Sequence, residues 1–445
     1  MSAAVSAIWC VDVGSTFTKS VLVDADDGTV LHTGSTRTTI DTDVLDGIAT
    51  LRADLPAEPT ETLVCSSAGG GLRLAVVGYE REVTGEAGYR VGLSAGARVV
   101  HVAAGELDGA AVRALRESRP DIVLLVGGTD GGNADVLLHN ATRLAKARIG
   151  VPIVVAGNSE VVDEVAQILA STGRRFVLAD NVVPHIGAIS PQSARAAIRT
   201  VFLEHVIGGK GLSRGPDFAR LVRAATPDAV LTGVGVLAEA VGDVMVVDVG
   251  GATTDVYSAL VPQGEDAEIE RDVVGRLWHE RTVEADLGMR WSALGVVDAA
   301  ARERIPMPSG LEAYAARAAA DPGHLPQDES EVAHDLALAR VAAVVAARRH
   351  GRPSTPTESP RPLACVGLVV GSGGVLRHNG PDAALRVVRA LTTDHGGGWR
   401  VPERAQVAVD TAYLLFAVGL LAETRPRAAR SLASRVSATG PTVGE

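Results

Sequence analysis

The chain has 445 residues, of which 46% are apolar and 21% are charged, and this composition excludes a largely disordered protein. The length predicts two or three domains instead of a single core. A net charge of −11 without a long basic run argues against a nucleic-acid partner. No apolar run has the length needed to cross a bilayer, so no membrane partner is expected.

The N-terminus and the cysteines indicate a cytoplasmic protein. The first ten residues, MSAAVSAIWC, lack a charged region before their apolar residues, which argues against a secretion signal. The three cysteines, Cys10, Cys65 and Cys365, are widely spaced and form no CxxC pair. We therefore expect buried reduced thiols, and no zinc or iron–sulfur site made by one chain.

The first part of the chain predicts strands that precede a helix. Apolar runs indicate strands over 8–13, 19–23, 30–35 and 63–65, and a helix over 43–51. From about residue 96, strands and helices alternate. Strands are predicted over 98–102, 122–126, 153–155 and 176–178, and helices over 106–116, 134–147 and 159–170.

Strands separated by helices of this length predict a parallel α/β region, which we place at 96–190 between a first lobe (1–95) and a helical connection (191–243). Ligands of such sheets gather at the carboxyl ends of the strands. The loops GGTDGGN (127–133), GNSE (157–160) and ADNV (179–182) fall there. They form a candidate binding rim, although ordinary turn chemistry explains the same residues equally well.

One strand–turn–strand pattern occurs twice. The stretch VMVVDVGGATTDVY (244–257) ends a buried strand with Asp248 and then turns at Gly250. The stretch VDVGSTFTKSV (11–21) repeats it with Asp12 and Gly14, and five of the eleven aligned positions are identical. Glycines let a backbone approach a ligand, successive turn N–H groups can bind an anion, and a carboxylate can hold a hydrated divalent cation. The repeat therefore predicts a duplicated chain with two phosphate-binding hairpins.

A third glycine turn follows a predicted strand over 363–370. Its residues, Gly371, Ser372, Gly373 and Gly374, would let backbone press against an adenine or ribose. Alone, such a turn is weak evidence for adenosine binding. Its place after the second hairpin in the sequence makes that evidence stronger. It belongs to a second lobe that we place at 244–422, and the tail, 423–445, is predicted to be disordered.

The order of these parts resembles the actin, sugar-kinase and Hsp70 ATPase superfamily. More narrowly, VDVGSTFTK, SSAGGGLR, VGGTDGGN, ADNVVPHIGAI, VVDVGGATTDVYS, RTVEADLGMR and GSGGVLRH together resemble the glutamate mutase MutL family over residues 8–422. The resemblance implies an α/β fold: a duplicated actin-like, ribonuclease H-like ATPase with an inserted parallel α/β domain. It also implies an ATP- and Mg-dependent accessory protein that reactivates or chaperones an adenosylcobalamin-dependent mutase.

The resemblance implies roles for individual residues. Asp12 and Asp248 would hold magnesium or its waters and orient the attacking water. Phosphates would be bound from one side by Gly14, Ser15, Thr16 and Lys19, and from the other by Gly250, Gly251, Thr253 and Thr254. The adenosine would face Gly371, Gly373 and Gly374. We expect the inserted region to contact the mutase. The identity of that mutase, a homodimeric state, and whether ATP is hydrolysed or only bound stay open.

Other functions fit parts of the pattern. A small-molecule kinase of the same superfamily needs a carboxylate base, for which Glu160, Asp130 and Asp180 are the candidates. An activator of a radical dehydratase needs a bridging iron–sulfur cluster, which the scattered cysteines argue against. A cobalamin-binding subunit would carry D-x-H-x-x-G, which this sequence lacks. A nucleotide-gated scaffold without turnover also stays open.

Overall fold

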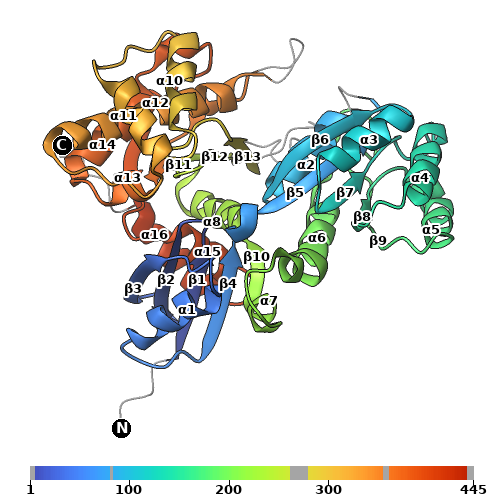
Figure 1. Cartoon of the computed structure of the whole chain (residues 1–445), viewed down its shortest axis with the longest axis horizontal. Coiled ribbons are helices and arrows are strands. Elements are labelled where there is room, and N and C mark those ends of the chain that lie inside the picture. Colours follow the sequence, from blue (N-terminus) through green and yellow to red (C-terminus); the bar gives the residue numbers. More distant parts are fainter. Residues whose placement is uncertain (1–5, 81–83, 261–278, 354–359, 438–445) are drawn as a thin grey trace. The chain divides into compact units, whose positions relative to one another are not determined.

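The computed structural model describes residues 6–80, 84–260, 279–353 and 360–437 (Figure 1). It divides into two units. The first contains the described residues of 6–24 and 30–229, and the second those of 25–29, 230–260 and 279–437. The boundary falls within α8 (Thr226–Val241). Within the described residues, no helix combines the length and apolarity that a bilayer crossing demands.

The first unit is built on a five-stranded sheet with the order β10-β4-β1-β2-β3. β1 pairs antiparallel with β2 and parallel with β4, whose other neighbour is β10. The bounds are β1 (Ala7–Val13), β2 (Phe17–Asp24), β3 (Val30–Arg37), α1 (Val44–Ala53), β4 (Glu61–Ser66) and β10 (Val222–Ala225). β1 is buried at every position because both faces of this central strand are covered.

The second unit repeats that topology with the order β13-β12-β11-β14-β15. The antiparallel hairpin of β11 and β12 corresponds to β1 and β2, and β11 pairs in parallel with β14. The strand bounds are β11 (Val244–Val249), β12 (Thr254–Ala259), β13 (His279–Glu284), β14 (Leu368–Ser372) and β15 (Gln406–Val409). Two sheets with the same order and directions confirm the duplicated, actin-like α/β fold that the hairpin repeat predicts.

The predicted parallel region lies between β4 and β10 in sequence. It is a wholly parallel sheet with the order β6-β5-β7-β8-β9. Its strands are β5 (Leu72–Gly78), β6 (Ala97–Ala104), β7 (Ile122–Leu125), β8 (Ile153–Val155) and β9 (Phe176–Leu178). Its helices are α2 (Glu86–Ser94), α3 (Gly109–Glu117), α4 (Asp135–Ala147), α5 (Val162–Ala170) and α6 (Gln192–Val201). The sheet therefore begins at Leu72, earlier than the predicted start of the insert.

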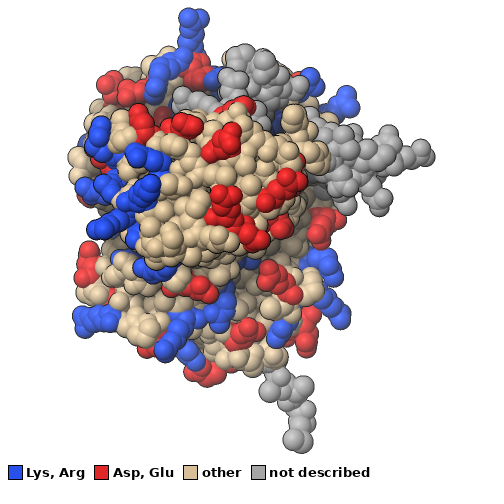
Figure 2. Space-filling model, turned by 90° about the vertical axis from the view of Figure 1, so that its right-hand side faces the viewer, with Lys and Arg blue, Asp and Glu red and all other residues tan. Residues whose placement is uncertain are grey.

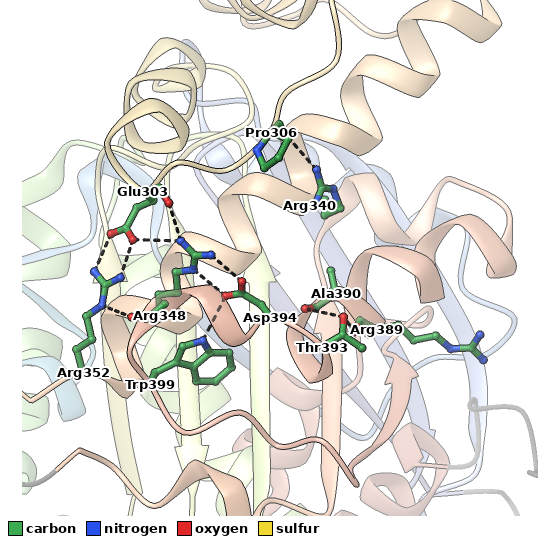
Figure 3. A network of polar contacts seen from close by, with 11 residues as sticks. Glu303, Pro306, Arg340, Arg348, Arg352, Arg389, Ala390, Thr393, Asp394 and Trp399 are labelled. Atoms are coloured by element: carbon green, nitrogen blue, oxygen red, sulfur yellow. Dashed lines mark hydrogen bonds and ion pairs between the residues drawn. The ribbon is translucent and has the colours of Figure 1, made fainter.

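Helices cover the second sheet and form a layer beyond it. Their bounds are α10 (Ala293–Arg302), α11 (Leu311–Ala320), α12 (Glu329–Gly351), α13 (Gly374–Arg377), α14 (Pro381–Arg389), α15 (Leu415–Leu421) and α16 (Pro426–Ser437). An ion-pair network joins α12 to the chain after α10 and after α14: the buried guanidinium of Arg348 on α12 binds both Glu303 and Asp394, and Arg352 binds Glu303 (Figure 3).

The structure corrects three expectations. The tail is not disordered throughout, because α16 buries Leu432 and Val436 together with three alanines of the same face. The connection over 191–243 is not only helical: between α7 (Asp217–Leu221) and α8 the four residues of β10 join the first sheet. Cys10 and Cys65 are buried as expected, whereas Cys365 is exposed.

Candidate functional site

The first hairpin turns between Val13 and Phe17. The N–H of Gly14 donates to the carbonyl of Phe17 at 3.1 Å, and a Cβ at Gly14 would lie 2.7 Å from that same oxygen. A side chain at this position would therefore push the turn open. Ser15 and Thr16, at the tip, are exposed to solvent.

Asp12 lies two residues before Gly14. Its carboxylate is buried and accepts hydrogen bonds from two side chains. Its Oδ1 accepts from the hydroxyl of Thr226 at 2.5 Å and from the thiol of Cys65 at 3.6 Å. Its Oδ2 lies 3.8 Å from Nζ of Lys19, its register partner on β2. Thr226 is also the first residue of α8, whose N-terminal dipole favours a negative charge there.

Cys65 contributes to this arrangement as a neutral donor. Burial, together with the charge of Asp12, raises the pKa of the Cys65 thiol well above its ordinary value. The thiol therefore keeps its proton and shares it with the Asp12 carboxylate. Neither Cys65 nor Thr226 is predicted as a site residue from the sequence, because both reach Asp12 from distant parts of the chain.

A magnesium ion suits the chemistry of this carboxylate. Mg²⁺ is usually bound through one or two carboxylates, retained waters and substrate phosphates instead of a complete protein cage. Among the residues that the structure describes, no three His, Cys, Asp or Glu side chains form a metal cluster. Asp12 therefore fits as a single carboxylate that holds a hydrated ion, and not as part of a preformed cage.

The glycine run that follows β4 lies beside the first turn. The N–H of Ser67 donates to the carbonyl of Val13 at 3.0 Å, so residues 67–71 leave the sheet next to the hairpin. Gly69, Gly70 and Gly71 all have positive φ angles, and a Cβ at either of the last two would meet open space. The parallel pairing of β4 with β1 brings this run to the site.

The second hairpin reproduces the first in detail. The N–H of Gly250 donates to the carbonyl of Thr253 at 2.9 Å, as Gly14 does to Phe17. Asp248 stands opposite Asp255 in the register, as Asp12 stands opposite Lys19. The sites differ here, because Asp255 forms a buried ion pair with Arg281 at 2.5 Å. The second hairpin thus offers no cation where the first offers Lys19.

The predicted threonines of the second hairpin make different contacts. Thr253 donates its hydroxyl to the carboxylate of Asp255 at 3.0 Å. Thr254 is fully buried and donates its hydroxyl to the carbonyl of Leu287. Thr254 therefore fastens the strand to the segment after β13, and Gly251 and Thr253 lie closer to the tip.

The third glycine turn lies at the same edge of the second sheet. Gly373 has a φ of 115°, and a Cβ there would collide with the carbonyl of Val249 at the end of β11. Gly371 is buried, and a Cβ there would collide with the side chains of Leu376 and Val388. Gly374 is exposed with open space around it. Gly371 and Gly373 thus allow close packing, whereas Gly374 presents backbone to solvent.

The structure therefore collects the predicted residues into two sets. The first unit holds Asp12, Gly14, Ser15, Thr16 and Lys19 at one edge of its sheet. The second unit holds Asp248, Gly250, Gly251, Thr253, Thr254, Gly371, Gly373 and Gly374 at the corresponding edge of its own sheet, since the β11–β12 turn and the end of β14 adjoin.

A separate polar rim lies at the carboxyl ends of β7, β8 and β9. The buried amide of Asn181 donates to the carbonyl of Gly128 at 3.0 Å and to Asp130 at 2.9 Å. The buried amide of Asn158 donates to the carbonyl of Gly132 at 3.1 Å. Burial raises the pKa of Asp130, but hydrogen bonds from Ser159 and Asn181 outweigh it and hold that pKa below its ordinary value. Asp130 thus joins the three loops as a structural anion.

The sequence model of the MutL protein family matches residues 8–436, which is nearly the whole chain. The chain belongs to the MutL family. Protein MutL of Clostridium tetanomorphum is 34% identical over 443 residues, which cover 93% of this chain and 96% of that protein. The resemblance found in the sequence motifs is therefore confirmed, and it extends through α16.

Solved structures similar to this MutL-family chain come from several kinds of protein. Gluconate kinase from Lactobacillus acidophilus is 13% identical, with a TM-score of 0.36 over 98% of this chain and 92% of that one. Ethanolamine utilization protein EutJ from Carboxydothermus hydrogenoformans is 11% identical, with a TM-score of 0.30 over 97% and 92%. Nucleotide-free acetone carboxylase is 15% identical, with a TM-score of 0.36 over 93% and 70%.

Proposed function

We propose that this MutL-family protein binds and hydrolyses Mg-ATP in order to reactivate or chaperone an adenosylcobalamin-dependent mutase. The observation that carries the proposal is the matched pair of hairpins. Each unit ends its central strand with an aspartate two residues before a glycine turn, and the two turns share one hydrogen-bond geometry. A duplicated turn of this kind suits a ligand with several phosphate groups.

In this proposal the chain's own groups orient the phosphates and their metal. Gly14, Ser15 and Thr16 offer exposed backbone at the first turn, and Lys19 adds a positive charge. Gly250, Gly251 and Thr253 offer the second turn, with Thr254 holding its strand in place. Gly374, supported by Gly371 and Gly373, offers backbone to the adenosine.

Asp12 and Asp248 hold the waters of the magnesium ion in this proposal. A bound magnesium ion would supply charge neutralisation at the phosphates, and the two carboxylates would orient water for attack on the terminal phosphate. Asp12 suits this task because the donors Thr226 and Cys65 both meet its Oδ1, while Oδ2 faces Lys19. Hydrolysis depends mainly on such positioning and charge neutralisation, so each carboxylate is important for turnover.

The inserted sheet is the proposed contact for the mutase. Its three rim loops are fastened to each other by Asn158 and Asn181, and the next residues include Ile186, which is 87% exposed. A large exposed apolar side chain beside these loops suits protein contact. The face drawn in Figure 2 carries acidic and basic side chains interspersed around a broad uncharged surface. Ile186→Asp should weaken mutase binding without changing basal ATP hydrolysis.

The test of the whole proposal is phosphate release from Mg-ATP, measured with the purified protein alone and with an inactivated cobalamin mutase from the same host. We expect the mutase to stimulate release. Asp248→Ala should lower turnover about a hundredfold or more. Asp382→Ala, an exposed aspartate in the first turn of α14, is the matched control and should leave turnover unchanged.

Two results would count against the proposal. ATP binding without hydrolysis in either condition would point to a nucleotide-gated scaffold. Hydrolysis that no cobalamin mutase changes would leave an ATPase but remove the accessory role proposed for it.

A further inference from the structure

We infer that the residues following the third strand of each sheet, Thr38 in the first unit and Gly288–Ser292 in the second, are positioning residues for phosphate binding. They hydrogen-bond to the carbonyl groups of each turn and thereby orient the amide N–H groups of the turn toward the ligand. The inference rests on the nucleotide binding proposed above, and it concerns residues outside the two hairpins.

In the second unit, the segment after β13 binds three consecutive carbonyls of the turn. These hydrogen bonds run from Met289 N–H to Gly250 at 3.0 Å, from Arg290 N–H to Gly251 at 2.8 Å, from Trp291 N–H to Gly251 at 3.1 Å and from the Ser292 hydroxyl to Ala252 at 3.1 Å. The carbonyls of Gly250, Gly251 and Ala252 therefore face this segment.

The direction of the amide groups follows from the geometry of the peptide bond. In a planar trans peptide, the C=O of one residue and the N–H of the next point in opposite directions. Carbonyls of residues 250, 251 and 252 that face the segment therefore turn the N–H groups of Gly251, Ala252 and Thr253 away from it. Successive N–H groups pointing to one side form an anion-binding concavity. The segment fixes that concavity before any phosphate arrives.

Two small residues and one arginine make this segment fit. A Cβ at Gly288 would collide with the backbone of Ala252, so only glycine allows the close approach. The single hydroxyl proton of Ser292 is shared between the carbonyl of Ala252 and that of Ala285, 2.9 Å away, which directly follows β13. The guanidinium of Arg290 binds the buried carboxylate of Asp335 on α12 at 2.8 Å, which anchors the segment to the helical layer.

In the first unit, a single residue donates the hydrogen bonds to the carbonyls of the turn. Thr38 directly follows β3, whereas three residues separate the segment in the second unit from the end of β13. Its hydroxyl donates to the carbonyl of Gly14 at 2.8 Å, and its N–H donates to the carbonyl of Thr16 at 3.0 Å. By the same peptide geometry, the N–H groups of Ser15 and Phe17 point away from Thr38. Two unrelated sequences that follow corresponding strands of the duplicated fold thus hold the same side of the turn.

The fluorescence of Trp291 can report ligand binding at the turn of the second unit. The backbone N–H of Trp291 is one of the donors to the turn, and its side chain is 67% exposed. Of the other three tryptophans, Trp9 and Trp399 are buried, at 0% and 7% exposure, and Trp278, which lies outside the described residues, is replaced throughout the fluorescence experiment (Trp278→Phe). A phosphate that settles on the turn should therefore change the fluorescence of Trp291, and Trp291→Phe should remove that change.

The experiment measures the Kd for Mg-ATP by calorimetry and by tryptophan fluorescence. Ser292→Ala and Thr38→Val should each raise Kd by roughly fivefold, the effect of one orienting hydrogen bond. Gly288→Ala should raise it further and reduce the fluorescence change. Thr38→Ser keeps the hydroxyl and should bind like the wild type. Ser434→Ala on α16 and Gly380→Ala, where a Cβ meets open space, are the matched controls.

The melting temperature measured without nucleotide distinguishes a variant that positions phosphate less well from a variant that is simply less stable. Ser292→Ala should melt within the range of the controls, while its stabilisation by Mg-ATP becomes smaller. Thr38→Val also removes a hydroxyl that lies 3.1 Å from the hydroxyl of the buried Thr18, so it should melt below the controls, and its Kd is compared with that of Thr38→Ser. Wild-type binding together with unchanged Kd values in Ser292→Ala and Thr38→Val would overturn the inference. Absence of Mg-ATP binding by the wild type would instead overturn the proposed function on which the inference rests.

Discussion

The hydroxyl of Thr226 donates a 2.5 Å hydrogen bond to Oδ1 of Asp12, although 214 residues separate the two in sequence. Both side chains are buried. Thr226 stands where β10 ends and α8 begins, so the parallel strands β1, β4 and β10 bring it to the end of β1. A buried carboxylate thereby keeps a donor that water would otherwise supply.

Replacing that donor should destabilise the protein. Thr226→Val keeps the shape of the side chain but leaves Oδ1 of Asp12 with only the thiol of Cys65. An unsatisfied buried acceptor costs about 1–3 kcal/mol, which urea unfolding at neutral pH can measure. Thr226→Ser retains the hydroxyl and should unfold like the wild type. Equal unfolding free energies for the valine and serine variants would contradict a stabilising role for this hydrogen bond.

Lys19 should contribute to nucleotide affinity through its charge. Its side chain is 24% exposed, so it can reach both Asp12 and an anion at the first turn. Lys19→Ala should raise the Kd for Mg-ATP about tenfold, and the difference should shrink as salt screens the charge. Lys146→Ala removes an exposed lysine of α4 and is the control. A Kd that Lys19→Ala leaves unchanged would separate Lys19 from the phosphates.

His350 should make the protein less stable in acid. Its ring lies fully buried between the hydroxyls of Ser258 and Thr282, each 2.9 Å away. Burial, and then the charge of Arg361, lower the pKa of His350 well below 6.5. The unfolded chain therefore takes up a proton as pH falls below about 6.5 while the folded chain does not. This contribution is present above that pH and is lost below it.

Each pH unit should cost up to about 1.4 kcal/mol from this group until the folded pKa is reached. The measurement is the free energy of unfolding between pH 7.5 and pH 5, compared with His350→Gln, which should show a shallower slope. His395→Gln changes an exposed histidine and should keep the wild-type slope. Identical slopes for all three proteins would show that His350 protonates equally in both states.

The ion-pair network of Figure 3 should be sensitive to loss of its central arginine. Arg348 is 5% exposed and binds Asp394 at 2.6 Å and Glu303 at 3.2 Å. Arg348→Met should cost about 1–3 kcal/mol, because the partly buried carboxylate of Asp394 loses its arginine, while Glu303 keeps Arg352. Arg340→Met on the same helix removes only a bond to the carbonyl of Pro306 and should cost under ~1 kcal/mol. Similar unfolding midpoints for the two variants would contradict this ranking.

Local patterns predicted much of this fold. Both hairpins, the strands over 122–126, 153–155 and 176–178, and the helices between them follow from apolar runs and turn residues, which act over a few positions. The duplicated fold follows from one repeated stretch. The helix α16 was missed because its buried face consists mainly of alanines and its other residues are mainly arginines and serines, so the segment is polar on average even though its buried residues recur at helical spacing.

Long-range contacts could not be predicted in this way. β10 is only four residues long and includes Arg223, so it becomes a strand through pairing with β4 and not through its own pattern. Thr226 and Cys65 have no local signal that points to Asp12. Met289 contributes through its backbone N–H, which no side-chain pattern reveals.

The interruption of the first sheet has a consequence for synthesis on the ribosome. β4 ends at Ser66 and its neighbour β10 begins at Val222, so the whole inserted sheet is translated between two adjacent strands. Until β10 emerges, β4 is the outer strand of the nascent sheet, with open hydrogen-bonding groups along one side. The growing chain is therefore most exposed to wrong pairing while the insert is being made, and a fast-folding insert shortens that interval.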